Sequence, residues 1–195
     1  MLKNVVFLDR DGVINQDSPD YIKSWAEFEF IPGSLDAVAD LTRAGCPIFI
    51  ISNQSAVGRQ YMDQAELDRI TRNMAQRIMD HGGRLTDVFY CPHKPGDHCD
   101  CRKPKPGLIF KASEQYRIDL SSAVMVGDSP KDIECARNAG CGGAVLVTSG
   151  YQELDLAAPH QTDHFPDYIA EDLRKAAEWI IQRLPAKTFS NDDAQ

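Results

Sequence analysis

Long apolar runs are missing from this sequence of 195 residues. The longest uninterrupted apolar stretches cover residues 5–8 and 48–51, whereas a membrane-spanning helix needs about 18 consecutive apolar residues or more. The first residues, MLKNVVFLDRDG, also lack the apolar core and cleavage site of a secretory signal. We therefore expect no membrane association and a cytoplasmic location.

An excess of basic residues is missing as well. The chain has 21 Lys and Arg against 29 Asp and Glu, which gives a formal net charge of −8. Binding to nucleic acid without regard to sequence needs positive charge against the phosphates, so we expect no nucleic-acid partner. The length and the 43% hydrophobic content are typical of one globular domain. We place this domain at residues 1–185, with residues 186–195 as a flexible polar tail.

Short apolar segments alternate with helical patterns along the chain. Continuous apolar runs are typical of strands buried on both faces of a parallel sheet, and Asp63 followed by Glu66 is typical of a helix start. We expect an α/β fold, a doubly wound, Rossmann-like parallel sheet with helices on both faces. We expect strands at residues 5–8, 47–51, 88–90, 123–126 and, as the last strand, 144–147. We expect helices at 34–44, between Asp63 and Gly82, at 107–116 and at 131–138. A further, C-terminal helix is expected to have its apolar face on Ile169, Leu173, Ala176, Ile180 and Leu184.

Polar residues follow these strands, three of them directly and Lys103 at the end of a longer segment, at the edge where open α/β sheets bind ligands. Asp9 and Asp11 follow the first strand, Ser52 ends the second, Lys103 comes after the third, and Asp128 follows the fourth. Neighbouring carboxylates repel one another unless a cation lies between them. Mg²⁺ binds one or two carboxylates together with phosphate oxygens. We therefore predict a magnesium site formed by Asp9, Asp11 and Asp128 beside a bound phosphate.

The same residue types suit phosphoryl transfer. Asp9 can attack phosphorus to give an aspartyl-phosphate, and Asp11 can protonate the leaving oxygen and later deprotonate the attacking water. The Ser52 hydroxyl and the Lys103 charge can stabilise the transferred phosphoryl group. Lys105 is the alternative to Lys103 in this role.

Four ordered motifs give the sequence a family resemblance. DRDGV at residues 9–13, the apolar run ending at Ser52, the lysine in RKP at 102–104, and GDSPKD at 127–132 occur in sequence order. The chain thereby resembles the haloacid dehalogenase (HAD) superfamily of aspartate-nucleophile phosphatases. This resemblance implies a Mg²⁺-dependent phosphatase and favours Lys103 over Lys105.

Three cysteines and two histidines share a proline-rich segment, residues 91–106, which we call the zinc loop. Their spacing, CxH followed by CxC, predicts a closed tetrahedral Zn²⁺ site of the Cys₃His type. His98 is an alternative ligand. Because four ligands leave no open position for water, we expect a structural zinc rather than a catalytic one. The ligands would be Cys91, His93, Cys99 and Cys101.

The intervals between the motifs leave no room for a cap domain, so we expect an uncapped enzyme. Two subfamilies dominate the uncapped members with a CxH…CxC loop, the D-glycero-D-manno-heptose 1,7-bisphosphate 7-phosphatases and the histidinol-phosphatases. The stretches FLDRDGVIN, FEFIPG, SNQS, CPH and CDCRKPKPG resemble the first of these. That resemblance implies release of the 7-phosphate, in a route that supplies heptose for cell-surface glycan. It also implies substrate contacts from Asp17, Ser18, Pro19, Asp20, Asn53, Gln54, Ser55 and Arg102.

Several alternatives stay open. Arg102 can bind a phosphate with its guanidinium fork or balance the anionic zinc site. Ser129 stands where related enzymes often carry a lysine, and Lys131 can replace that lysine or lie on the helix surface. Rival functions are a histidinol phosphatase, another small sugar phosphatase, a polynucleotide-end phosphatase and a non-catalytic binding module. We expect a monomer that acts on a small sugar phosphate.

Overall fold

The computed structural model describes residues 1–150 and 165–185 of the chain. Its centre is a six-stranded parallel sheet in the order β3-β2-β1-β4-β5-β6. The chain starts in the middle of the sheet, moves to one edge, and returns across β1 to build the other half. The strands are β1 Val6–Leu8, β2 Ile48–Asn53, β3 Asp87–Cys91, β4 Val124–Gly127, β5 Gly143–Val147 and β6 Tyr168–Ala170.

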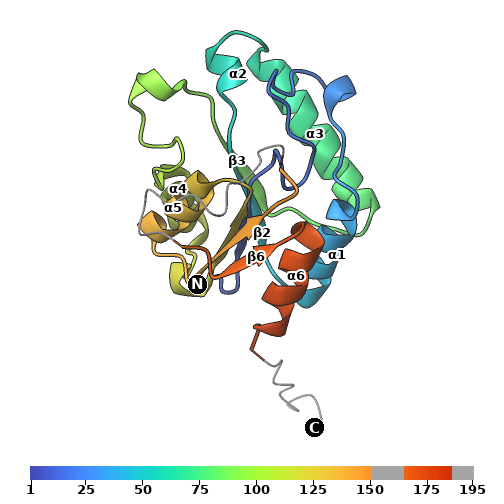
Figure 1. The fold of residues 1–195 in the computed structure, drawn as a ribbon, viewed down its shortest axis with the longest axis vertical. Coiled ribbons are helices and arrows are strands. Elements are labelled where there is room, and N and C mark those ends of the chain that lie inside the picture. The colour runs from blue at the N-terminus through green and yellow to red at the C-terminus, as the bar shows by residue number, and fades with distance from the viewer. Residues whose placement is uncertain (151–164, 186–195) are drawn as a thin grey trace.

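Helices cover both faces of the sheet, which confirms the doubly wound architecture. Figure 1 shows α4 and α5 on one side of the sheet and α1, α3 and α6 on the other. Side chains of β1 alternate between these layers, with Val6 and Leu8 packed toward α1, α3 and α6 and Phe7 packed toward α4 and α5. The helices are α1 Ser34–Ala44, α2 Ser55–Gly58, α3 Gln64–Asp80, α4 Gly107–Tyr116, α5 Pro130–Ala139 and α6 Leu173–Gln182, with three short 3₁₀ helices at Trp25–Glu27, Pro95–Asp97 and Leu120–Ser122.

Local capping chemistry sets several helix ends where the sequence predicts them. The Asp63 carboxylate accepts a hydrogen bond from the Glu66 amide at 2.8 Å, which satisfies one free N–H at the start of α3. Gly45 ends α1 in the left-handed conformation, with φ of 88°. The predicted helix start at Asp63 and the predicted helix 34–44 are confirmed.

The expected end of the sheet is wrong. Residues 144–147 are not the last strand, because β6 comes later and pairs with β5 through Val147 and Ala170. Ile169 belongs to β6 rather than to the C-terminal helix, and α6 begins after Asp172, whose carboxylate accepts from the Lys175 amide. The error has a simple origin. Ile169 lies four residues before Leu173, so in the sequence it continues the apolar spacing of the helix.

The site lies at the carboxyl edge of this sheet, where loops and α2 form its walls. Among the described residues, no separate cap domain is inserted between the strands. Within the same residues, every helix is too short or too polar to pass through a membrane. The expected flexible tail, residues 186–195, lies outside the described residues.

Candidate active site

A cavity of about 300 Å³ opens at the carboxyl ends of β1, β2 and β4. The parallel register aligns Leu8 with both Ile50 and Val126, so the polar residues that come after these three strands meet at one edge. The Asp9 amide donates to the Val126 carbonyl at 2.9 Å, which extends this pairing by one residue into the site. Residues predicted from separate motifs therefore line one cavity: Asp9, Asp11, Asp17, Ser18, Pro19, Ser52, Asn53, Gln54, Ser55, Arg102, Lys103 and Asp128.

A buried lysine lies between two carboxylates in this cavity. Lys103 Nζ is 2.8 Å from Asp9 Oδ2 and 2.6 Å from Asp132 Oδ1. The Lys103 side chain is only 2% exposed and that of Asp132 only 1%. Burial alone would lower the pKa of Lys103, but the carboxylates of Asp132 and Asp9 outweigh it and raise the pKa above its ordinary value. The lysine therefore carries a fixed positive charge beside Asp9.

Lys105, the alternative to Lys103, lies in a different environment. Its ammonium group pairs at 3.1 Å with Asp100, whose side chain is 96% exposed. Lys105 does not line the cavity that contains Asp9. The geometry therefore favours Lys103 for contact with a group bound at Asp9.

Three carboxylates form a cluster that can hold a divalent cation. Oxygens of Asp9, Asp128 and Asp132 lie within 4.8 Å of one another. Burial first, and then the carboxylates of Asp9 and Asp132, raise the pKa of Asp128 to about 8. A hard cation with oxygen ligands would relieve this repulsion, and such ligands are the ones that Mg²⁺ prefers. The donor set therefore fits magnesium.

Glycine allows Asp128 to approach the first motif closely. Gly12 has φ of 76°, and a Cβ atom there would lie 2.1 Å from Asp128 Oδ2. Any side chain at this position would therefore displace the Asp128 carboxylate or the turn that carries it.

The Asp11 carboxylate is held apart from this cluster. Its Oδ1 accepts from Arg10 Nε at 3.1 Å, from Arg10 Nη2 at 2.6 Å and from Asn15 Nδ2 at 2.8 Å. Its Oδ2 accepts from Gln54 Nε2 at 2.8 Å. These donors fix the orientation of Asp11, and its side chain is not one of the three in the carboxylate cluster.

Residues 52–55 contribute to the site in different ways. The buried Ser52 hydroxyl accepts from Gln54 Nε2 at 3.1 Å. The Asn53 amide instead holds the Lys103 backbone, donating to its carbonyl at 3.2 Å and accepting from its N–H at 3.1 Å. Ser55 lines the cavity as the first residue of α2. Asn53 thus ties β2 to the zinc loop at the lysine.

The predicted substrate loop, residues 17–20, lies against the cavity along most of its length. Asp17, Ser18 and Pro19 line the cavity, and Asp20 does not. Asp17 Oδ1 accepts from the Ser18 amide at 2.8 Å, while burial and the Asp11 carboxylate raise the pKa of Asp17. Asp20 faces outward, and its carbonyl oxygen accepts from Lys23 Nζ at 2.6 Å.

The four predicted zinc ligands converge at the base of the zinc loop. Cys91 Sγ lies 3.7 Å from Cys99 Sγ, 3.2 Å from Cys101 Sγ and 3.6 Å from His93 Nδ1, and His93 Nδ1 lies 3.2 Å from Cys101 Sγ. Tetrahedral Zn²⁺ with bonds of about 2.0–2.3 Å separates its ligand atoms by roughly 3.5–3.8 Å. The four side chains therefore fit zinc after small shifts. His98 is not part of the group.

Arg102 extends from this loop toward the cavity. Its Nη1 donates to the His93 carbonyl at 3.1 Å, and the residue lines the cavity beside Lys103. One N–H group is thus used inside the loop, and within residues 1–150 and 165–185 the rest of the guanidinium fork is left for another acceptor.

Two buried residues of the site are absent from the predicted set. Asp132 completes the carboxylate cluster. Its place at the end of the GDSPKD motif, four residues after Asp128, is the feature of the sequence that could have predicted this role. Arg10 is fully buried against the Phe28 ring. Sequence alone gives no reason to bury this arginine, because the Phe28 ring that packs against it lies 18 residues further along the chain.

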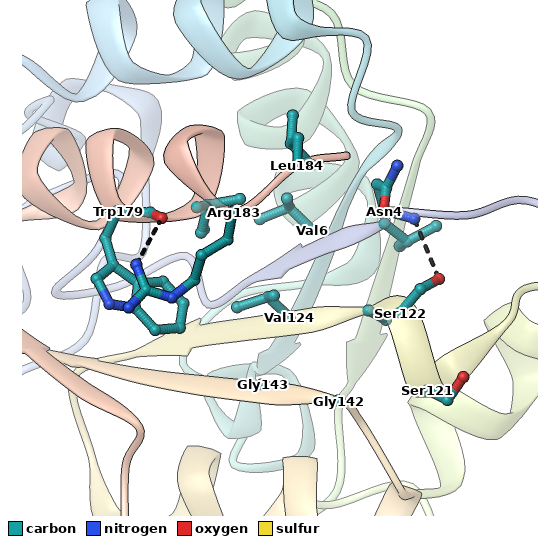
Figure 2. A pocket seen from close by; sticks show the side chains of 13 residues that line it. Asn4, Val6, Ser121, Ser122, Val124, Gly142, Gly143, Trp179, Arg183 and Leu184 are labelled. Carbon is teal, nitrogen blue, oxygen red and sulfur yellow. Dashed lines mark hydrogen bonds between the residues drawn. The ribbon is translucent and has the colours of Figure 1, made fainter. Parts of the chain in front are cut away.

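A second cavity lies at the opposite, amino edge of the same sheet. Its volume is about 170 Å³, and Figure 2 shows Val6 and Val124 from the sheet, with Trp179 and Arg183 of the C-terminal helical segment at one side. The Asn4 amide donates to Ser122 Oγ at 3.2 Å across it. None of the described residues that line this cavity carries a carboxylate side chain.

Comparisons with known proteins agree with this geometry. A family model described as HAD-hydrolase-like matches residues 100–176. A D-glycero-β-D-manno-heptose-1,7-bisphosphate 7-phosphatase of Pseudomonas aeruginosa is 42% identical over 183 residues, which cover 93% of this chain and all of that protein. The Escherichia coli protein of the same description is 33% identical over 94% of this chain and 93% of its own length.

The solved structures include a similar one with ligands. A D,D-heptose 1,7-bisphosphate phosphatase from Bordetella bronchiseptica, complexed with magnesium and phosphate, has a TM-score of 0.86 and 38% identity to this chain. The match covers 94% of this chain and all of that one.

Proposed function

Because this chain belongs to the D-glycero-D-manno-heptose 1,7-bisphosphate 7-phosphatase family of HAD hydrolases, we propose that it releases the 7-phosphate of that sugar. The product would enter the route to nucleotide-activated heptose and the lipopolysaccharide core. The observation that carries the proposal is Asp9, a carboxylate paired with the buried Lys103 at 2.8 Å inside a cluster that suits Mg²⁺.

The first half of the proposed reaction takes place at Asp9. Its carboxylate oxygen forms a bond to phosphorus as the bond from phosphorus to the sugar oxygen breaks, which leaves an aspartyl-phosphate. Asp11 gives a proton to the departing sugar oxygen. Lys103 and the Ser52 hydroxyl stabilise the charge on the transferred group. Mg²⁺ bound by Asp9 and Asp128 would supply further charge neutralisation at the phosphate, and Asp132 would hold Lys103 in place.

The second half of the reaction restores the enzyme. Asp11, now ionised, takes a proton from water as the water oxygen bonds to phosphorus and the bond to Asp9 breaks. The products are orthophosphate and free Asp9. The hydrogen bonds from Arg10, Asn15 and Gln54 support this assignment, because they fix the orientation of the Asp11 carboxylate in both halves.

A phosphate-release assay tests the proposed substrate. The wild-type protein with Mg²⁺ is given heptose 1,7-bisphosphate, heptose 7-phosphate and histidinol phosphate. We expect the highest kcat/KM on the bisphosphate, and phosphorus NMR should show loss of the 7-phosphate while the 1-phosphate remains. Faster hydrolysis of histidinol phosphate would assign the chain to the other substrate class. No hydrolysis of any of the three would favour a binding module.

We also propose that Cys91, His93, Cys99 and Cys101 hold a structural Zn²⁺. A structural zinc can contribute on the order of 10 kcal/mol to ordering a short loop, and this loop carries Arg102 and Lys103 into the cavity. The substitution Cys99→Ser should lower both the zinc content and kcat/KM, while far-UV circular dichroism stays near that of the wild type. Cys141→Ala, at a buried cysteine outside the loop, is the control. Full activity of zinc-free protein would refute the proposal.

The remaining proposals concern assembly and location. We propose a monomer, because one copy supplies the Asp9 carboxylate, Lys103 and the carboxylate cluster of the candidate site. A cytoplasmic location is proposed from the sequence alone. Light scattering on the purified protein tests the monomer, and a stable dimer would refute it. Fractionation of cells tests the location.

A further inference from the structure

Arg59 is a cation at the rim of the cavity to which the proposed reaction gives no role. It comes directly after α2, is exposed, and lines the same cavity as Asp9 and Lys103. Its side chain makes no hydrogen bond or ion pair with residues of the described ranges, 1–150 and 165–185. In contrast, Lys103 is paired with two carboxylates and Arg102 donates to a carbonyl.

The backbone at Arg59 is fixed against the zinc loop. The Gly58 amide donates to the Pro92 carbonyl at 3.1 Å, and a Cβ atom on Gly58 would lie only 2.5 Å from that oxygen. The Arg59 amide donates to the Ser55 carbonyl at 2.9 Å. Because the same loop carries Arg102, the two arginines enter the cavity from adjoining walls.

The side chain of Arg59 lies over an aromatic ring rather than beside an acid. Its guanidinium carbon lies 6.0 Å from the centre of the Tyr21 ring, and the Tyr21 ring lies 5.5 Å from that of Tyr61. Tyr21 comes directly after the loop that contributes Asp17, Ser18 and Pro19 to the cavity. A guanidinium packed against a ring keeps its N–H groups free for an anion.

The charge of the cavity makes such a cation useful to an anionic substrate. Five carboxylates line it, against the cations Arg59, Arg102, Lys103 and Lys131. Lys103 already compensates two of the carboxylates. A substrate group that carries negative charge far from Asp9 therefore needs a different cation. A guanidinium suits this role because it can bind a phosphate through two N–H groups.

We propose that Arg59 binds the phosphate of the substrate that is not transferred, and so makes the enzyme select a sugar bisphosphate over a monophosphate. This inference rests on the proposed function. Arg59 would then act beside Arg102, which reaches the same cavity from the adjoining zinc loop.

The test compares Arg59→Ala with the wild type on two substrates, heptose 1,7-bisphosphate and heptose 7-phosphate. Loss of a charge-assisted bond predicts about a tenfold to hundredfold drop in kcat/KM on the bisphosphate, carried mainly by KM. The change on the monophosphate should be less than about threefold. Arg59→Lys should retain part of the selectivity, because it keeps the charge and loses the fork. Arg72→Ala, at another exposed arginine of the adjoining helix, is the matched control.

Product inhibition separates this role from a general effect on the site. Orthophosphate binds where the transferred group binds, so its inhibition constant should be the same in Arg59→Ala and wild type. Equal losses on both substrates, or weaker inhibition by orthophosphate, would overturn the inference. So would unchanged selectivity in Arg59→Ala when the wild type itself prefers the bisphosphate. A wild type that does not prefer the bisphosphate would overturn the proposed function, and the inference with it.

Discussion

The two edges of the same sheet differ sharply in what they can do. At the carboxyl edge the cavity of about 300 Å³ is lined by five aspartates and four cations. At the amino edge the cavity of about 170 Å³ lies between apolar side chains, Ser121, Ser122, Asn4 and the exposed Arg183 (Figure 2). Strands β1, β4 and β5 reach both edges. A cavity alone therefore does not make an active site, since charged side chains gather in only one of these two cavities.

The physical difference between the edges comes from the chain segments that enter and leave the parallel strands. At the carboxyl edge the chain leaves each strand and turns toward the next helix. Glycine at position 12 permits the Asp128 carboxylate to lie close to the turn that follows β1. The start of α5 also lies there, with Ser129 and Asp132 accepting hydrogen bonds from its first backbone N–H groups. At the amino edge Ser122 and Arg183 are already paired with backbone carbonyls. Ser122 Oγ, for example, donates to the Asp119 carbonyl at 3.0 Å.

The largest effects should come from the two aspartates of the first motif. Asp9→Asn should reduce turnover to background, because an amide of the same shape is not a nucleophile. Asp11→Asn should lower kcat by about 10²–10⁴-fold through loss of acid and base catalysis. Phosphate release measures both, and circular dichroism checks the fold. Asp100→Asn, at a 96% exposed side chain on the zinc loop, is the control. Substantial turnover by Asp9→Asn would refute the covalent mechanism.

The two lysines of the zinc loop offer a matched comparison of stability. Lys103→Met leaves the buried Asp132 and the partly buried Asp9 without their cation, which should cost about 3–5 kcal/mol in the free energy of unfolding. Lys105→Met removes only an exposed pair with Asp100, which should cost about 1 kcal/mol or less. Urea unfolding in Mg²⁺-containing buffer measures both values. Similar costs for the two substitutions would mean that the Lys103 pairs are no stronger than a surface pair.

The carboxylate cluster should make stability depend on pH when Mg²⁺ is removed by dialysis. The pKa of Asp128 is about 8 in the folded chain, against an ordinary value of 3.8. Between these values the folded state binds more protons than the unfolded state, so the free energy of unfolding decreases as pH rises from 5 to 8. The urea midpoint should fall over this range, and Mg²⁺ added at pH 8 should restore much of it. In Asp128→Asn the fall should be smaller; an equal fall would assign it to other groups.

The smallest effect is expected at the amino edge. Ser122→Ala removes the acceptor for the Asn4 amide and the hydrogen bond to Asp119, which should cost about 1 kcal/mol in the free energy of unfolding. kcat/KM on the bisphosphate should stay within the error of the wild type. A loss of activity without a loss of stability would show that the two edges of the sheet are coupled.

Much of this protein can be predicted from its sequence alone. Buried parallel strands appear as continuous apolar runs, and helix ends appear as capping residues such as Asp63 and Gly45. The order of these elements predicts the doubly wound sheet, and the sheet in turn predicts that polar residues after its strands share one edge. The zinc-loop cysteines and His93 lie close together in the sequence, so their convergence needs little long-range information.

Only the tertiary structure decides contacts between residues that are far apart in the chain. β6 exists because Ala170 pairs with Val147, a partner that no local pattern reveals. Asp132 joins Asp9 through Lys103, and Arg59 reaches the same cavity because α2 packs on Pro92. Local periodicity and capping depend on neighbours within about one helical turn, and most of these predictions succeed. The exception is Ile169, which fits the spacing of the C-terminal helix but belongs to β6. The identity of a buried charge's partner depends on how separate loops pack, and for that the three-dimensional fold is required.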